Sequence, residues 1–91
     1  MGPEVERGKV AILEHVKEVM KAYSLEPTIL VFQWKEDFEN VRWNLNVFRG
    51  SRKRQLHFKE QDVETWHETP AVAGKYLKAI LSVVECMLKN R

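Results

Sequence analysis

Cysteine is almost absent from this chain, because Cys86 is the only one among 91 residues. One thiol excludes a disulfide within the chain and any zinc site built from several cysteines. No apolar stretch approaches the roughly 20 residues that a membrane span requires. Residues 1–7 begin acidic and lack the basic-then-apolar order of a signal peptide. We therefore expect a cytoplasmic protein without a membrane segment.

Glycine and proline are also scarce, with four and three residues, and no repeat or low-complexity segment occurs. Hydrophobic residues make up 44% of the chain and charged residues 31%, which is typical of a globular protein rather than a disordered one. We expect residues 1–91 to form a single small α+β domain. Because a chain this short buries only about two-thirds of its unfolded surface, pairing with a second copy would enlarge a thin core.

Apolar residues recur at three- and four-residue steps over residues 4–23, which predicts an amphipathic helix. Gly8 weakens its first turns, so we expect the firm part to begin near Lys9. Pro27 stops the helix. The sequence therefore predicts one N-terminal helix with a single apolar stripe.

A second long helix is predicted over residues 70–91. Thr69 suits the N-cap, Pro70 suits the first helical position, and an apolar stripe continues from there to the last residues. Val63 and Trp66 lie three residues apart and indicate a shorter helical turn over residues 61–67.

Three segments between the helices are rich in β-branched and aromatic residues or alternate apolar with polar side chains, which predicts strands. They are residues 28–35, 41–49 and 54–59, separated by turns at 36–40 and 50–53. Such short links favour an antiparallel meander. The predicted fold is α+β, in the order α-β-β-β-α. The N- and C-terminal helices pack on one face of the three-stranded sheet, and a short extra helical turn precedes the last helix.

The predicted strands have two different faces, because residues two apart share a face. The apolar face, which we expect to form the core, collects Leu30, Phe32, Trp34, Val41, Trp43, Leu45, Val47, Leu56 and Phe58. The other face is polar except for Ile29, Val31 and Phe48, and collects Gln33, Lys35, Arg42, Asn44, Asn46, Lys53, Gln55, His57 and Lys59. Each helix has only one apolar stripe, so both should cover the first face and leave the second open.

The sequence contains no arrangement typical of an active site or cofactor site. Its three histidines lack metal-site spacing, and we expect each at the surface. Cys86 falls within the last helix without cationic neighbours in the sequence, which indicates a structural thiol. No phosphate-binding glycine loop occurs. We therefore predict no enzyme, no cofactor, no metal and no small-molecule substrate.

The order α-β-β-β-α is similar to that of double-stranded RNA-binding domains. That family has a lysine cluster at the start of its last helix, whereas residues 69–75 here are Thr-Pro-Ala-Val-Ala-Gly-Lys, and its groove-contacting first loop corresponds to the acidic residues 36–39. These departures remove its RNA-binding surface, so we do not assign the chain to it. Residues 41–67 resemble the small sheet with which integrases bind arm-type DNA sites. Small secretion chaperones share similar elements and dimerise, but are usually longer and acidic.

Positive charge is concentrated in the middle of the chain. Residues 28–59 carry seven Lys or Arg against three acids, although the net charge of the whole chain is only +2. We therefore expect a binding module that contacts DNA or RNA through the basic sheet face and the hairpin tip at 49–54. The residues predicted to contact nucleic acid are Arg42, Arg49, Arg52, Lys53, Arg54, His57 and Lys59.

Two alternatives remain open at this level. The polar face could simply be solvated, and the basic turn could serve to discourage aggregation. The long last helix could also bind another protein or a second copy of this chain, because Leu81 and Val83 widen its apolar stripe beyond what one sheet face requires.

Overall fold

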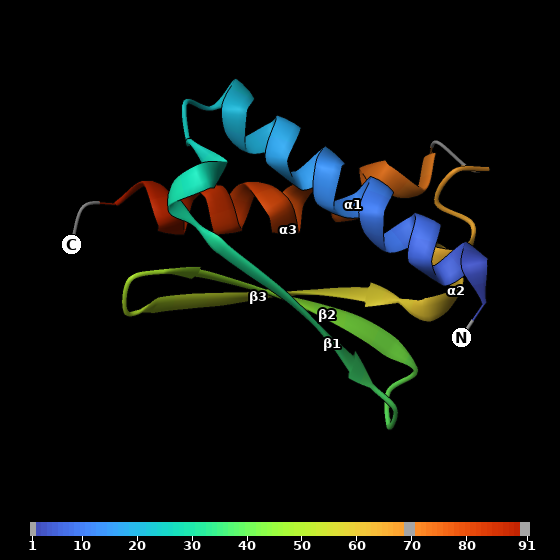
Figure 1. Cartoon of the computed structure of the whole chain (residues 1–91). Helices are drawn as coiled ribbons and strands as arrows, with labels where there is room; N and C mark the ends of the chain where they lie inside the picture. The colour runs from blue at the N-terminus through green and yellow to red at the C-terminus, as the bar shows by residue number, and fades with distance from the viewer. Residues whose placement is uncertain (1, 69–70, 90–91) are drawn as a thin grey trace.

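Helices cover one face of a three-stranded antiparallel sheet in the computed structural model of this protein (Figure 1). The structure describes residues 2–68 and 71–89. The elements in chain order are α1 (Pro3–Ala22), η1 (Pro27–Ile29), β1 (Val31–Asp37), β2 (Arg42–Arg49), β3 (Arg52–Lys59), α2 (Glu60–Glu64) and α3 (Ala71–Leu88). The predicted order is confirmed, including the short helix before the last one. The predicted helix start at Thr69 and Pro70 lies outside the described residues.

The sheet is a meander in which β2 lies between β1 and β3. Its first strand begins later than predicted, because residues 27–29 form a 3₁₀ turn in which the Glu26 side chain accepts a hydrogen bond from the Thr28 amide. The same strand also ends later than predicted. Glu36 and Asp37, expected in a turn, pair with β2. The tight connection between β1 and β2 is therefore confined to residues 38–41.

Val41 was predicted to lie on the core face of the sheet, but the structure places it in the turn before β2. It lies in this turn with a φ of 50° and an exposed fraction of 62%, and its carbonyl accepts a hydrogen bond from the Glu60 amide. The alternation of β2 begins only at Arg42. Val41 lies outside it, because its left-handed backbone conformation belongs to the turn and not to the strand. Its apolar side chain therefore contributes nothing to the core.

The core lies between the inner face of the sheet and the helices. Phe58 on β3 is fully buried, with ring centroids of Trp34, Trp66 and Tyr76 at 5.8, 6.0 and 4.7 Å. His15, predicted at the surface, is half-buried beside Trp66, with centroids 6.0 Å apart and its Nε2 atom buried without a partner. The buried positions from the helices include Ile12, Val16, Met20, Ile80, Val84 and Met87.

Gly8 lies where α1 packs directly against the backbone of α2. A Cβ atom at this position would lie 1.9 Å from the carbonyl oxygen of Val63, far inside van der Waals contact. The helix begins at Pro3, one residue before the predicted start at residue 4, and it continues through Gly8. Glycine is present here because the backbone of α2 occupies the space of a side chain, and the packing outweighs the poor helix propensity of glycine.

A buried carboxylate connects the short helix α2 to α3. Asp62, exposed by only 8%, accepts hydrogen bonds from the Tyr76 hydroxyl at 2.5 Å and the Lys75 Nζ atom at 2.9 Å. Burial raises the pKa of Asp62, but these two hydrogen bonds outweigh it and the pKa is lowered overall. The Tyr76 hydroxyl also accepts a hydrogen bond from the Lys59 amide, so this network fixes the end of β3 as well.

Tyr76 should titrate at high pH in the folded protein. Its burial, together with the hydrogen bond to Asp62, raises its pKa from 10.0 to about 12. Because the folded pKa is raised, the stability that Tyr76 contributes is complete below pH 10.0 and is lost as the pH rises toward about 12. An ultraviolet absorbance titration of tyrosinate should show a step near 12 that Tyr76→Phe removes. A step that persists in the variant would contradict this assignment.

Candidate functional site

The face of the sheet that points away from the helices is the candidate site. We call it the open sheet face. The strand register gives it four rows from β1, β2 and β3: Val31, Phe48 and Lys53; Gln33, Asn46 and Gln55; Lys35, Asn44 and His57; Asp37, Arg42 and Lys59. All three α-helices lie on the opposite side of the sheet (Figure 1). The prediction of one covered face and one open face is therefore confirmed.

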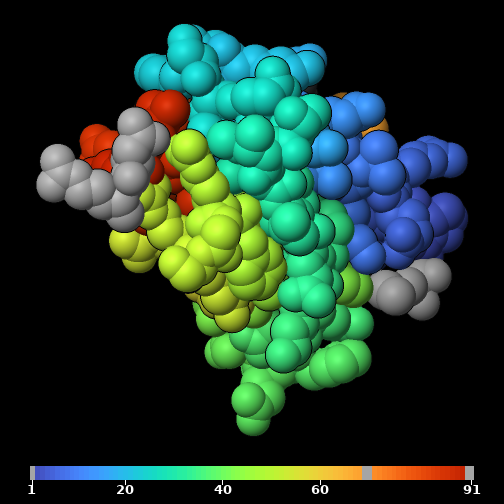
Figure 2. Space-filling view, turned by 60° about the vertical axis from the view of Figure 1, so that its left-hand side comes forward, coloured from blue at the N-terminus to red at the C-terminus, as the bar shows by residue number. Residues whose placement is uncertain are grey.

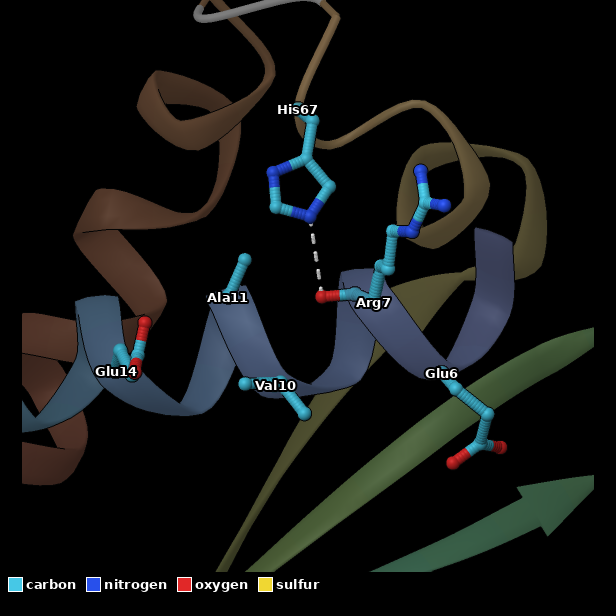
Figure 3. Close-up of a pocket in the computed structure, with 6 residues that line it drawn as sticks. All are labelled: Glu6, Arg7, Val10, Ala11, Glu14 and His67. Atoms are coloured by element: carbon cyan, nitrogen blue, oxygen red, sulfur yellow. Dashed lines mark hydrogen bonds between the residues drawn. The ribbon is translucent and has the colours of Figure 1, made fainter. Parts of the chain in front are cut away.

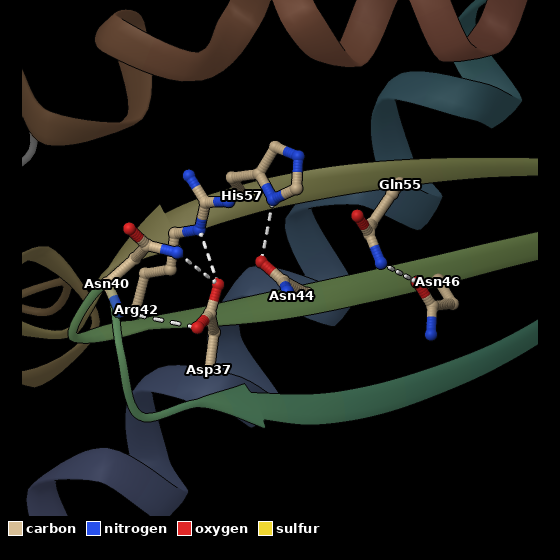
Figure 4. Close-up of polar contacts among 7 residues, drawn as sticks. All are labelled: Asp37, Asn40, Arg42, Asn44, Asn46, Gln55 and His57. Atoms are coloured by element: carbon tan, nitrogen blue, oxygen red, sulfur yellow. Dashed lines mark hydrogen bonds and ion pairs between the residues drawn. The ribbon is translucent and has the colours of Figure 1, made fainter.

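Two asparagines form the centre of this face. Asn44 and Asn46 on β2 are exposed by only 8% and 3%, because longer side chains flank them on both outer strands. Asn44 Oδ1 lies 2.6 Å from Nδ1 of His57, and Asn46 Oδ1 accepts a hydrogen bond of 2.7 Å from Gln55 Nε2 (Figure 4). Asparagine is depleted in strands. Two asparagines in the middle of the central strand therefore depart from the local strand propensity. Such departures are expected at functional or strained sites.

The neutral form of His57 is favoured in this arrangement. Burial lowers the pKa of His57 below its ordinary value of 6.5, and the positive charge of Arg42 lowers it further. Because Asn44 Oδ1 can only accept a hydrogen bond, Nδ1 of His57 carries the proton of the neutral ring and Nε2 is left as an acceptor. The neutral ring of His57 thus offers Nε2 as a hydrogen-bond acceptor on this face.

An ion pair joins two side chains of the row nearest the β1–β2 turn. Arg42 Nε donates to Asp37 Oδ2 at 3.1 Å, and the Asn40 side chain donates to the same oxygen at 3.0 Å (Figure 4). The hydrogen bond from Asn40 holds the pKa of Asp37 below its ordinary value, and the charge of Arg42 adds to this effect. Arg42 was predicted to contact phosphate, but the structure pairs it with a carboxylate of its own chain.

The three hairpin arginines point toward the helices and not onto the open sheet face. Arg49 donates to the Met87 carbonyl, Arg52 donates to the carbonyls of Cys86 (3.1 Å) and Lys89, and Arg54 Nε lies 3.1 Å from Cys86 Sγ. Figures 1 and 2 show the β2–β3 turn beside the C-terminal end of α3. The last carbonyls of a helix lack intrahelical partners and carry partial negative charge. Arg49 and Arg52 therefore cap α3, and Arg54 contacts the side chain of Cys86 in its last turn.

The structure thus separates the seven residues predicted to bind nucleic acid. Lys53, His57 and Lys59 are exposed on the open sheet face. The strand period could have assigned the arginines correctly, because Arg52 and Arg54 share parity with Leu56 and Phe58. Lys35 was placed on the polar face but not among the predicted contacts, and the cation beside Cys86 was not predicted. Lys35, exposed in the row of His57, belongs to the cationic set. Cys86, expected to lack cations, has the Arg54 guanidinium beside it.

A hollow of about 340 Å³ opens at one end of the open sheet face. It is lined by Lys35, Asn44 and Gln55 of the open sheet face, by Glu36 and Asp37 at the end of β1, and by Phe38 and Glu39 of the β1–β2 connection. The hollow therefore offers an ammonium group, amide groups and carboxylates within one concavity. Such a mixture suits a ligand with both hydrogen-bond donors and acceptors.

A second hollow, of about 370 Å³, lies between α1 and the segment after α2 (Figure 3). His67 lies over the helix, with Nε2 3.3 Å from the Arg7 carbonyl, and Val10 and Ala11 supply apolar lining. Figure 3 shows the Glu6 carboxylate directed away from His67. This hollow does not gather a set of chemically active groups, so we assign it to the packing of α1.

No family model, no curated protein and no solved structure matches this chain. Within residues 2–68 and 71–89, no three histidine, cysteine, aspartate or glutamate side chains gather as a metal site would require. In the same residues, no helix combines the length and apolar character needed to cross a membrane. The case for a function therefore rests on the residues of the open sheet face.

Proposed function

We propose that this protein is a non-catalytic binding module that contacts nucleic acid through the open sheet face. The observation that supports this most is a helix-free sheet surface with an ordered amide centre and exposed lysines on both outer strands. Lys35 lies on β1, and Lys53 and Lys59 lie on β3. Ammonium groups on flexible stems neutralise phosphates, and amide groups hydrogen-bond to bases. Aromatic Phe48 completes the surface that such a ligand requires.

The hairpin tip is not part of this proposal, although the sequence favoured it. Its arginines are already bound to the end of α3, so their replacement would disturb that helix as well as the surface charge. An experiment that removes Arg52 or Arg54 would therefore mix a loss of stability with a loss of binding. Lysines of the open sheet face avoid this ambiguity, because Lys35 and Lys53 are exposed on it.

Binding should depend steeply on salt and on the lysines of this face. We expect affinity for an oligonucleotide to fall as salt rises, and the double variant Lys35→Ala, Lys53→Ala to bind more weakly. The slope of log affinity against log salt should also become shallower, by about 0.7 to 0.9 for each phosphate that the variant no longer neutralises. Fluorescence anisotropy at several salt concentrations measures both quantities.

The matched control is the double variant Lys21→Ala, Lys78→Ala. It removes the same charge from exposed positions on α1 and α3, away from the open sheet face. Equal weakening by both variants would show that only net charge matters and would contradict a site on this face. Failure of the unmodified protein to bind either DNA or RNA at low salt would overturn the proposed function altogether.

A second candidate function is protein interaction or homodimerisation through α3. Leu77 and Leu88 are exposed by 42% and 40% on this helix, and Leu81 is half-buried. Val83, expected to widen the same stripe, is instead part of the core with an exposed fraction of 4%, which narrows the available surface. Sedimentation at micromolar concentration distinguishes the candidates. A dimer that ignores nucleic acid favours α3, and a monomer that binds it favours the open sheet face.

We also propose that the protein is located in the cytoplasm. The supporting observation is chemical, because the chain has one thiol, Cys86, which is half-buried beside Arg54. A reducing compartment keeps such a thiol in the state that the structure describes.

A further inference from the structure

The width of the open sheet face limits the kind of nucleic acid that it fits. Neighbouring strands lie about 4.8 Å apart, so the three backbones span about 10 Å before any side chain is added. The major groove of duplex DNA is about 12 Å wide and admits one helix or a two-stranded ribbon. The full sheet is therefore too broad to enter it. The two-stranded β2–β3 tip is narrow enough, but its arginines turn back to α3.

The position of the amide groups adds a second limit. Asn44 and Asn46 lie on the central strand and are almost buried between longer neighbours. They are recessed, so base edges must come to them. Bases of a duplex stay inside its grooves, whereas bases of a single strand can be splayed onto a protein surface. The exposed amides of Gln33 and Gln55, which flank Asn46, can therefore be reached by the splayed bases of a single strand, whereas a duplex keeps its bases inside.

The arrangement of charges on the open sheet face also favours a single strand. The exposed lysines lie on the outer strands and flank the amides, where phosphates at the margin of a bound strand can reach them. Asp37 and Glu39 line the hollow of about 340 Å³ together with Asn44. Carboxylates repel phosphates but accept hydrogen bonds from the amino groups of bases. This end of the face therefore suits a base.

Phe48 supplies a place for stacking. It is half-buried in the row of Lys53, whose Nζ lies 5.8 Å from the centre of its ring. Stacking of a base on an aromatic side chain contributes substantially to single-strand binding and tolerates any sequence. We propose, building on the proposed function, that the open sheet face binds single-stranded nucleic acid with its bases toward the amide rows and Phe48, and that it discriminates against duplexes.

Paired anisotropy titrations test this inference. A labelled single strand of about 12 nucleotides, as DNA and as RNA, is compared with the matching duplex at one salt concentration. We expect the single strand to bind about tenfold more tightly or better, and Phe48→Ala to weaken it about tenfold. The control Tyr23→Ala removes an exposed aromatic at the end of α1 and should leave binding unchanged. Circular dichroism melting establishes that each variant is folded.

A measurement on the unmodified protein makes the test independent of any variant. In ¹⁵N NMR spectra, the side-chain amide signals of Gln33, Asn44, Asn46 and Gln55 should shift when the single strand is added. Those of Gln61, exposed on α2, should not.

The outcomes separate this inference from the proposed function. Equal or tighter duplex binding, or unshifted face amides in the presence of a bound single strand, would overturn the inference and leave nucleic-acid binding intact. Absence of binding to both forms would overturn the proposed function and the inference together.

Discussion

Alanine in place of Gly8 should destabilise the protein by about 3 kcal/mol or more, the upper range for overpacking a tightly packed site. The added Cβ atom would lie 1.9 Å from the Val63 carbonyl oxygen, a backbone atom that cannot rotate away. Helix α1 must then move from α2, which disturbs the buried contacts of Val5 and Ile12 in the core. The gain in helix propensity, about 1 kcal/mol, cannot offset this. Urea unfolding followed by circular dichroism measures the change.

Gly74→Ala is the matched control, with the same chemical change in the other long helix. No described atom lies within 4 Å of a Cβ built at Gly74. We expect this variant to be stabilised by about 1 kcal/mol, because alanine favours the helix and nothing is displaced. The two variants should therefore shift the unfolding midpoint in opposite directions. A Gly8→Ala protein as stable as the original would show that α1 and α2 do not approach closely at this position.

Truncation of Phe58 should have the other large effect on stability. Phe58→Ala removes a fully buried ring that contacts Trp34, Trp66 and Tyr76. Phenylalanine-to-alanine changes in cores typically cost about 3–5 kcal/mol, through reduced burial and the cavity left behind. Since the free energy of unfolding of a domain is only about 5–15 kcal/mol, we expect the variant to lose a large part of its stability. Near-ultraviolet circular dichroism should also lose the signal of ordered aromatic rings.

Phe38→Ala controls for the loss of an aromatic side chain. Phe38 lies in the β1–β2 connection with an exposed fraction of 78%, so its removal should change the free energy of unfolding by no more than about 0.5 kcal/mol. If both phenylalanine variants were equally destabilised, the assignment of Phe58 to the core and Phe38 to the turn would be wrong. A small effect at Phe58 alone would instead place the centre of the core elsewhere.

The candidate site was only partly accessible from the sequence. Alternation along the strands identified the polar face and its lysines, because side-chain direction in a strand follows from a period of two. It also implied that Arg52 and Arg54 face the core side, although the turn composition suggested a free basic tip. The partner that they meet there, the end of α3, could not be predicted. Its position depends on how far the last helix extends over the sheet.

What the sequence alone determined is the set of elements, their order and the two faces of the sheet, since periodicity and propensity act over a few neighbouring residues. The tertiary structure decided the remainder. It alone showed that Gly8 allows α1 to contact α2, that Asp62 is buried between Tyr76 and Lys75, and that Arg49 and Arg52 cap a helix. Each of these contacts joins residues distant in the chain. Close packing and the pairing of buried polar groups select them only once the layers have come together.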